Sequence, residues 1–513
     1  MTAHGGNGHH GVGCWRTVTS QQKAFTRLLS SQQKASARQS APKRNEFGFP
    51  TNYHGQKRGL VILAEFTDLK FKATNNREKY DNILNTPGYT TSEGFRGSVA
   101  DYFRDQSDGL FELQFDVVGP FTTKYNYKYY GENNDYGDDK HAEDMIVEMC
   151  QAADSLVNFA DYDWDGDGEA DEVFVLYAGM SESDTDKADY IWPHMWSLDE
   201  AGLQLFLDGM KINIYACSNE LKASGRINGI GTFCHEFSHC MGLPDFYDTL
   251  YSGEFGMADF DLMSSGNYAG NGFSPVGYTA YEKMFCGWQE PIVLSDEDVT
   301  IDSLRPISEH GDFYIIYNDG HPSEYYMIEN RQKTGWDKSY PAKGLMITHV
   351  DYDTLMWVCN LPNTVITMEK ALELYGLPIS NDHQRMTIFH ADNNDDKKYW
   401  NAIGGYYTKS TASTDLYPYQ KNDSLTATSA PAATLFHQNA DSTMLMQGAI
   451  LDIKQNADGT INFRYRAKVP IADAIQRING DRPRQGIYTL DGRKVNSPSK
   501  KGIYIIDGKK VVY

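Results

Sequence analysis

Two histidines and a glutamate stand at the spacing that a hydrolytic metal centre requires. His235, Glu236 and His239 form the pattern His-Glu-x-x-His. Residues four apart on a helix share one face, so both imidazoles project toward a single cation with the acid beside it. Zinc held by three protein ligands keeps a position open for water and lowers the pKa of that water toward about 7. The pattern predicts that His235 and His239 bind zinc and that Glu236 is the general base and acid.

The residues that follow predict that the chain turns back toward the metal. Gly242 comes three residues after the second histidine, and a residue without Cβ readily adopts the left-handed conformation that ends a helix. Pro244 cannot continue the helix. This reversal brings Asp245 to the metal as the expected third zinc ligand. Two alternatives stay open, Asp248 in the same segment and Glu282 on a later helix.

Further residues are expected around the zinc. Met263 stands in a tight Ser/Gly turn downstream of the motif and is expected to form the floor beneath the metal. An additional donor is expected to stabilise the oxyanion that develops during hydrolysis. The candidates are His194, Tyr247 and Tyr268.

An acidic loop predicts a second cation site. Carboxylates occupy loop positions 1, 3, 5 and 9, and glycine occupies position 6, as in an EF-hand-like Ca²⁺ loop. Position 12 holds Phe174 instead of a bidentate glutamate, so the loop is not an EF-hand, and Glu172 is an alternative source of the missing oxygen. Acids this close repel one another unless a cation neutralises them. We expect a structural Ca²⁺ ion bound by Asp163, Asp165, Asp167, Glu169 and Asp171.

Apolar patterning predicts the elements that position these residues. Strands alternate with helices over residues 58–290, which predicts an α+β domain with a mixed sheet. The expected strands and helices are Gly59–Phe66, a helix opened by the Ser98/Asp101 capping box, Leu110–Val118, His141–Leu156, Glu172–Tyr177 and Gly229–Met241.

From residue 291 the sequence changes to short strands separated by turn residues, including Tyr314–Tyr317, Tyr325–Glu329 and Leu345–Val350. This texture predicts a β-sandwich-like domain. Near the C-terminus, Gly486–Val495 recurs as Gly502–Val511, and each copy carries the Asp-Gly pair of a tight hairpin. The predicted organisation is an N-terminal arm or propeptide remnant over 1–57, a catalytic domain over 58–290, a β-rich domain over 291–468, and a linker with two hairpins over 469–513.

The motif and its surroundings resemble the immune inhibitor A type of secreted metallopeptidase, a metzincin-like group. The resemblance rests on HEFSHCMGLPDFYD followed by FDLMSSGNY, and it extends to SVADYFRDQSDGLFELQFDVVG, IWPHMW, YMIENRQKTGW and GLMITHVD. It covers about 58–360 and implies a secreted zinc endopeptidase with a β-rich domain behind the catalytic one. It also implies that His235 and His239 bind zinc, that Glu236 is the general base and acid, and that Met263 forms the Met-turn. His349 and Asp351 resemble family residues too, and we interpret them as structural.

The C-terminal repeat resembles the sorting segments of Bacteroidetes type IX-like secretion. The resemblance implies contact with secretion machinery and a secreted or cell-surface protein, although the first 40 residues contain no apolar signal-peptide core.

Composition excludes several functions. The 513 residues include 47 Lys and Arg against 69 Asp and Glu, a net charge of −22, which disfavours nucleic-acid binding. The apolar run Val173–Met180 is far shorter than the roughly 20 residues of a membrane span, so no transmembrane segment is expected. Seven cysteines allow at most three disulfides. Cys234 and Cys240 face different sides of the zinc helix, and pairing with Cys217 or Cys286 stays open.

The sequence therefore predicts a secreted zinc endopeptidase that acts on proteins or peptides. The alternatives are a catalytically silent protease scaffold used for binding or adhesion and, with no motif in its favour, a zinc exopeptidase.

Overall fold

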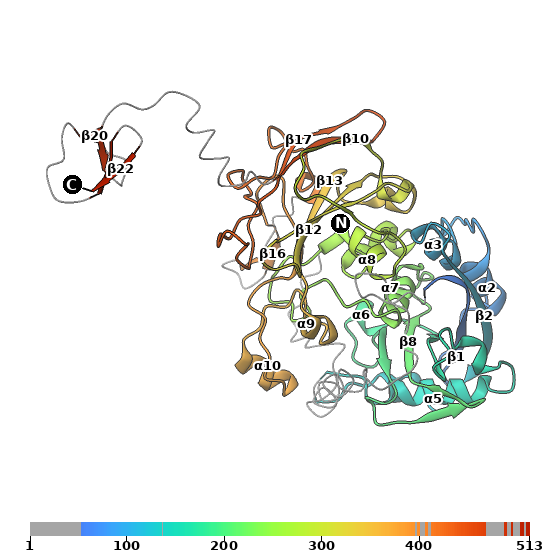
Figure 1. Ribbon diagram of the computed structural model, residues 1–513. Helices are drawn as coiled ribbons and strands as arrows, with labels where there is room; N and C mark the ends of the chain where they lie inside the picture. The colour runs from blue at the N-terminus through green and yellow to red at the C-terminus, as the bar shows by residue number, and fades with distance from the viewer. Residues whose placement is uncertain are drawn as a thin grey trace.

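The computed structural model describes residues 53–135, 137–395, 398–400, 406–408, 412–467, 487–489, 494–495, 503–506 and 509–512 (Figure 1). Residues 1–52 of the predicted arm, which runs over 1–57, lie outside the described residues. From Gly55 onward, the last residues of this predicted arm belong to the first strand.

A five-stranded mixed sheet forms the first half of the molecule, in the order β2-β1-β4-β8-β5. Four strands are parallel, and β5 runs antiparallel at one edge. Val61 and Leu63 pack on one face while Leu60 and Ile62 pack on the other, which explains the continuous apolar run of β1. The bounds are β1 Gly55–Glu65, β2 Phe111–Thr122, β4 Val173–Tyr177, β5 His194–Ser197 and β8 Ile214–Asn219.

Helices cover both faces of this sheet. Helix α5 (Ala142–Ala153) packs on one face, and α2 (Arg77–Asn85), α3 (Val99–Gln106) and α7 (Gly231–Cys240) pack on the other (Figure 1). The predicted capping box opens α3. Phe233 of α7 stacks on Phe174 of β4 with ring centroids 3.8 Å apart, so α7 is held firmly against the sheet.

A second five-stranded sheet, in the order β14-β13-β12-β11-β9, contains the three strands predicted beyond residue 291. Ile316 and Ile328 on one face share a core with a three-stranded sheet of order β10-β18-β17. Ile315 and Met327 on the opposite face join the core that contains α7. The bounds are β9 Ile292–Val293, β10 Val299–Leu304, β11 Tyr314–Tyr317, β12 Glu324–Arg331, β13 Gly344–Asp351, β14 Met386–Ile388, β17 Ala449–Gln455 and β18 Ile461–Arg466.

A single apolar core continues across residue 290, so the second sheet packs directly against the elements that precede it. Arg331, at the end of β12, strengthens the connection. Its fully buried guanidinium donates to the carbonyl oxygens of Tyr278 (2.9 Å) and Gly277 (2.8 Å), just before helix α8 (Ala280–Phe285). It also lies 3.4 Å from carboxylate oxygens of Glu329 and Asp337.

The C-terminal strands pair as two antiparallel hairpins within one sheet, as the repeat predicts, while both Asp-Gly turns lie outside the described residues. The other elements are α4 Tyr127–Gly131, α6 Glu182–Thr185, α9 Thr354–Val358, α10 Met368–Tyr375, β3 Glu169–Ala170, β6 Leu205–Leu207, β7 Met210–Ile212, β15 Lys398–Trp400, β16 Tyr406–Thr408, β19 Ile487–Thr489, β20 Lys494–Val495, β21 Ile503–Ile506 and β22 Lys509–Val512.

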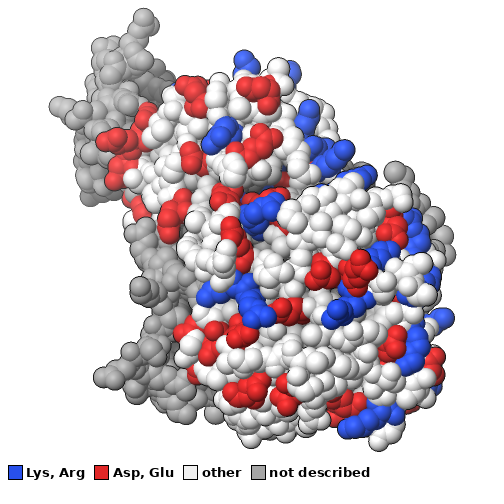
Figure 2. All heavy atoms as spheres, turned by 90° about the vertical axis from the view of Figure 1, so that its right-hand side faces the viewer, with Lys and Arg blue, Asp and Glu red and all other residues white. Residues whose placement is uncertain are grey.

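The surface seen in Figure 2 carries interspersed basic and acidic side chains, with no broad basic patch on this face. Among the described helices, none combines the length and the apolar character needed to cross a membrane. The described cysteines are all free, so Cys217, Cys234, Cys240 and Cys286 form no disulfide with one another.

Candidate metal centre

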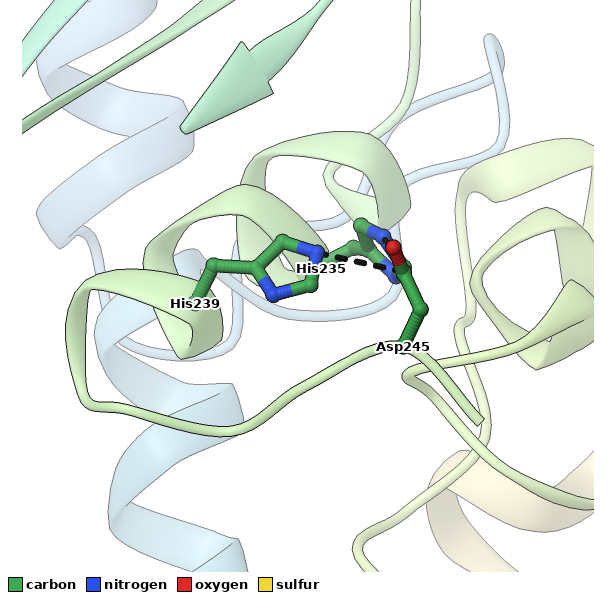
Figure 3. A group of neighbouring side chains, drawn as sticks. All are labelled: His235, His239 and Asp245. Carbon is green, nitrogen blue, oxygen red and sulfur yellow. Dashed lines mark ion pairs between the residues drawn. The ribbon is translucent and has the colours of Figure 1, made fainter. Parts of the chain in front are cut away.

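Helix α7 presents His235 and His239 on one buried face, as predicted (Figure 3). Their ring centroids lie 4.7 Å apart, with the rings nearly perpendicular. Gly242 has a φ of +95°, the predicted left-handed conformation, and the chain reverses there. The reversal returns Asp245, whose Oδ1 lies 3.2 Å from Nε2 of each histidine.

Backbone carbonyls fix both imidazole rings. Nδ1 of His235 lies 2.9 Å from the carbonyl oxygen of Leu262, and Nδ1 of His239 lies 2.7 Å from that of Leu243. A carbonyl oxygen only accepts, so each Nδ1 carries the hydrogen and each Nε2 keeps a free lone pair. Outer hydrogen bonds of this kind orient metal-binding histidines.

Asn360 positions the carboxylate of Asp245. Its Nδ2 donates to Asp245 Oδ2 at 2.7 Å, and its Oδ1 accepts from the backbone N–H of Asp245 at 2.5 Å. Although burial opposes ionisation, the positive charge that the two imidazoles carry when protonated holds the pKa of Asp245 well below its usual range.

The donor set fits a zinc ion. Asp245 is 1% exposed, and its Oδ1, which faces the two histidines, has no hydrogen-bond partner. A buried acceptor without a donor is costly unless a cation lies against it. One ligand atom from each of His235, His239 and Asp245 lies within 4.8 Å of the others, and two neutral imidazoles with a carboxylate suit tetrahedral zinc with one open position.

Of the two alternative ligands, neither joins this group. Glu282 accepts the N–H of Thr279 at 2.6 Å in the capping box of α8, so the alternative that placed it on the metal is wrong. Asp248 accepts from the hydroxyl of Ser252 (2.7 Å) and the N–H of Gly253 (3.0 Å), and it shapes the turn that follows Asp245.

The turn around Met263 supports the centre through its backbone. The carbonyl oxygen of Met263 accepts the N–H of Phe246, next to Asp245, at 2.7 Å. The preceding residue, Leu262, holds the ring of His235. Met263 itself is fully buried, so this turn anchors one histidine and the aspartate segment together.

Glu236 is buried beside the histidines. Burial raises the pKa of its carboxyl to about 8, a rise that Asp245 increases and His235 opposes. With His235 it lines a cavity of about 540 Å³. A raised carboxyl pKa makes the carboxylate a stronger base, which favours proton transfer to it from water.

The cavity contains two of the three candidate oxyanion donors, Tyr247 and Tyr268. His194 does not line it, and its ring nitrogens contact the carbonyl oxygen of Trp192 (2.6 Å) and the hydroxyl of Tyr215 (3.1 Å). Besides Glu236, the acidic lining residues are Asp248, Glu254 and Asp259, and none of the described residues that line the cavity is Lys or Arg.

The acidic loop brings three of its five predicted ligands together. Asp163, Asp165 and Asp167 each offer an oxygen within 4.8 Å of the others. Asp171 points back into the loop and accepts the N–H of Trp164; burial, together with repulsion by the three aspartates, raises its pKa to about 7. Glu169 pairs with Lys211 at 3.2 Å.

Glu172, the alternative oxygen source, is 1% exposed, and both of its carboxylate oxygens lack a hydrogen-bond partner. It does not lie with the three aspartates, so it does not replace the glutamate that an EF-hand loop carries at position 12.

The zinc motif is the signature of a hydrolase, and the comparisons with known proteins agree with it. Residues 52–290 match the family model described as the immune inhibitor A peptidase M6 catalytic domain. The pre-pro-metalloprotease PrtV of Vibrio cholerae serotype O1 (strain M66-2) is 27% identical over 286 residues, which cover 45% of this chain and 30% of that protein. Immune inhibitor A of Bacillus thuringiensis subsp. alesti is 26% identical over 277 residues, which cover 44% of this chain and 39% of that protein.

These matches identify a metallopeptidase domain, of the hydrolase class, in this chain. The alignments span less than half the length of either relative.

Proposed function

We propose that this protein is a secreted, zinc-dependent endopeptidase in which His235, His239 and Asp245 bind the metal and Glu236 is the general base and acid. One observation carries the proposal. Asp245 Oδ1 is buried, has no hydrogen-bond partner and lies 3.2 Å from both histidine nitrogens. A cation bound there would satisfy all three atoms.

Bound zinc supplies a Lewis acid that activates water and polarises the scissile carbonyl. Glu236 accepts the proton that the attacking water loses and returns it to the nitrogen of the leaving amine. Burial of Glu236 favours its protonated form, which helps it hold the proton between these steps. Tyr247 and Tyr268 line the same cavity, and their hydroxyl groups are the candidates for donating to the developing oxyanion.

The cavity supports internal cleavage over carboxypeptidase action. A free terminal carboxylate needs a cationic partner, and none of the described lining residues provides one. Protein and peptide chains are the proposed substrates.

Calcium binding by the loop of Asp163, Asp165, Asp167, Glu169 and Asp171 is part of the proposal. Asp163 already accepts the N–H groups of Gly166 (2.7 Å) and Gly168 (3.0 Å), which shapes the loop around its carboxylates. The ion would be structural, because the loop leads into β3 and β4.

Export and fold type complete the proposal. The C-terminal hairpin pair is proposed to be recognised by secretion machinery, and the protein to act outside the cell or on its surface. The catalytic fold is proposed to be metzincin-like, with the Met263 turn beneath the zinc.

Casein hydrolysis by the full-length chain, with and without a chelator, tests this function. In Glu236→Gln we expect a loss of activity on the order of 10³-fold with unchanged zinc content, because only the proton carrier is removed. Glu297→Gln, an exposed acid elsewhere, is the matched control. Unchanged hydrolysis by Glu236→Gln would overturn the mechanism. A zinc-loaded wild type that cleaves no protein substrate would favour the silent binding scaffold.

A further inference from the structure

A second group of metal-ligating side chains lies outside the zinc helix. His321 is in the turn between β11 and β12, Asp351 ends β13, and His437 is in the segment before β17. One ligand atom from each lies within 4.8 Å of the others. The three residues come from separate parts of the chain, so the fold itself assembles the group.

The two carboxylate oxygens of Asp351 differ in the same way as those of Asp245: one accepts hydrogen bonds and the other does not. Oδ2 accepts from Nε2 of His383 at 2.9 Å and from Nη1 of Arg385 at 2.5 Å. Oδ1 has no hydrogen-bond partner, although the residue is only 1% exposed. This oxygen faces Nδ1 of His437 at 3.3 Å.

The two histidines face the same point. Their rings stack with centroids 3.8 Å apart at 22°. Nδ1 of His437 also has no hydrogen-bond partner, and its side chain is 39% exposed, which gives a solvated ion a path to the group. A buried oxygen and an imidazole nitrogen, neither of which makes a hydrogen bond, therefore lie 3.3 Å apart beside His321.

Glu324 adds negative charge beside this group. Its carboxylate accepts hydrogen bonds from His349 (2.8 Å), the N–H of Phe436 (2.6 Å) and Asn318 (2.9 Å). Its second oxygen lies 3.4 Å from Nδ1 of His437.

The carboxylates of Glu324 and Asp351 both lie beside the ring of His437. Arg385 and His383 contact Asp351 Oδ2, and His349 contacts Glu324 Oε1. Asp351 Oδ1 and Glu324 Oε2 are the oxygens that face His437, and both would attract a divalent ion held between Asp351 and the two histidines.

We propose that His321, Asp351 and His437 form a second, structural binding site for a divalent transition-metal ion such as Zn²⁺. Two imidazoles and one carboxylate suit zinc better than Ca²⁺ or Mg²⁺, which prefer oxygen ligands throughout. The ion joins three separate segments. Through Asp351 it also steadies the stretch around Gln384, whose side chain donates to Glu254 (3.0 Å), a residue that lines the catalytic cavity.

Zinc content tests this site. The full-length chain is saturated with Zn²⁺ in excess Ca²⁺, desalted and analysed by atomic emission. We expect two zinc ions per chain in the wild type and one in each of His437→Gln, His321→Gln and His239→Gln. His310→Gln, an exposed histidine paired with Asp108, should keep both. Casein hydrolysis should persist in His437→Gln and disappear in His239→Gln, which separates the two sites.

One zinc ion in the wild type that His437→Gln retains and His239→Gln loses would overturn the second site and leave the proposed function standing. The opposite pattern would support the second site and overturn the catalytic one. If His437→Gln fails to fold by circular dichroism, His239→Gln decides, because it must retain one zinc ion if the second site exists.

Discussion

Asn360 bonds to both the backbone and the side chain of Asp245, across 115 residues of sequence. These two hydrogen bonds direct Asp245 Oδ2 away from the histidines and leave Oδ1 for the metal. The region beyond residue 290 therefore helps to build the metal centre as well as to cover it.

Replacing Asn360 with alanine should weaken zinc binding by about 10- to 100-fold, the usual effect of losing a hydrogen bond to a metal ligand. Casein hydrolysis at limiting zinc should fall in parallel and recover at high zinc. Competition with a chromogenic chelator measures the affinity. Asn393→Ala is the control, because Asn393 is exposed and has a similar positive φ (58° against 56°). Equal zinc affinities in wild type and Asn360→Ala would show that Asp245 needs no such support.

Gly242→Ala should destabilise the protein by about 1–3 kcal/mol, because φ = +95° is unfavourable for a residue with Cβ. The added Cβ would also lie 3.4 Å from the ring of Phe285. Since this turn returns Asp245 to the histidines, zinc affinity should decrease as well. Denaturant unfolding and zinc competition measure the two effects. Gly88→Ala, at φ +68° in open space, should lose stability but not zinc affinity, and a similar zinc loss there would contradict the argument.

The buried carboxyls around Arg331 predict a pH dependence of stability. Burial raises the pKa of Glu329 from 4.5 to about 7, although Arg331 and the N–H of Ala280 lower it. Glu282, Asp261 and Asp337 add negative charge nearby, and Lys283 adds positive charge. Three carboxylate oxygens of this cluster make no hydrogen bond: Glu282 Oε1, Glu329 Oε1 and Asp337 Oδ2.

Because the folded state holds this proton more tightly than the unfolded chain, the contribution of Glu329 to stability is complete below pH 4.5 and is lost as pH rises through about 7. Glutamine mimics the protonated acid. In Glu329→Gln the loss of unfolding free energy between pH 5 and pH 8 should be smaller by about 2 kcal/mol. Urea unfolding across this range measures it, with Glu297→Gln as the exposed control. A slope identical to that of the wild type would mean that Glu329 is ionised throughout.

Calcium should stabilise the acidic loop. Ca²⁺ at 100 times its dissociation constant should raise the unfolding free energy by about 2.7 kcal/mol. Asp163→Asn should abolish most of this increase, because Asp163 faces both Asp165 and Asp167. Thermal unfolding with Ca²⁺ and with Mg²⁺ measures the effect. An equal response of wild type and Asp163→Asn to Ca²⁺ would place the ion elsewhere.

The acidic cavity should favour basic substrate side chains. Peptides with Lys or Arg near the cleaved bond should have a higher kcat/KM than the same peptides with Glu, and salt should reduce the difference. Asp259→Asn, at an exposed lining position, should lower this preference by about 2- to 5-fold, the range expected for an exposed charge pair. Peptide hydrolysis at two ionic strengths provides the comparison. If neither salt nor Asp259→Asn alters the preference, the shape of the cavity and not its charge determines it.

Local chemistry made much of the catalytic site predictable. Helical spacing predicted the two histidines on one face, and Gly242 with Pro244 predicted the reversal that brings in Asp245. Glu282 caps helix α8 and does not lie with the histidines. The Thr279/Glu282 spacing is the sequence signal of that capping box.

Residues distant in sequence were not predictable in the same way. Asn360 has no periodic pattern around it, and neither it nor the cluster at His321, Asp351 and His437 forms a motif, because tertiary packing alone brings these side chains together. The strands beyond residue 291 were predicted, but the layers that cover their two faces were not. A strand buried on both faces has the same apolar sequence whichever layer covers it.

Because the second sheet closes the core around α7, we expect the peptidase half to need that sheet in order to fold. A recombinant fragment that stops at residue 290 would expose the apolar underside of α8 and the packing partners of Ile315 and Met327, and it would lack the guanidinium that holds the carbonyls of Gly277 and Tyr278. Such a fragment should be insoluble on expression, whereas a chain cut after β18 should remain soluble. Any attempt to transplant this catalytic unit must therefore carry the second sheet with it.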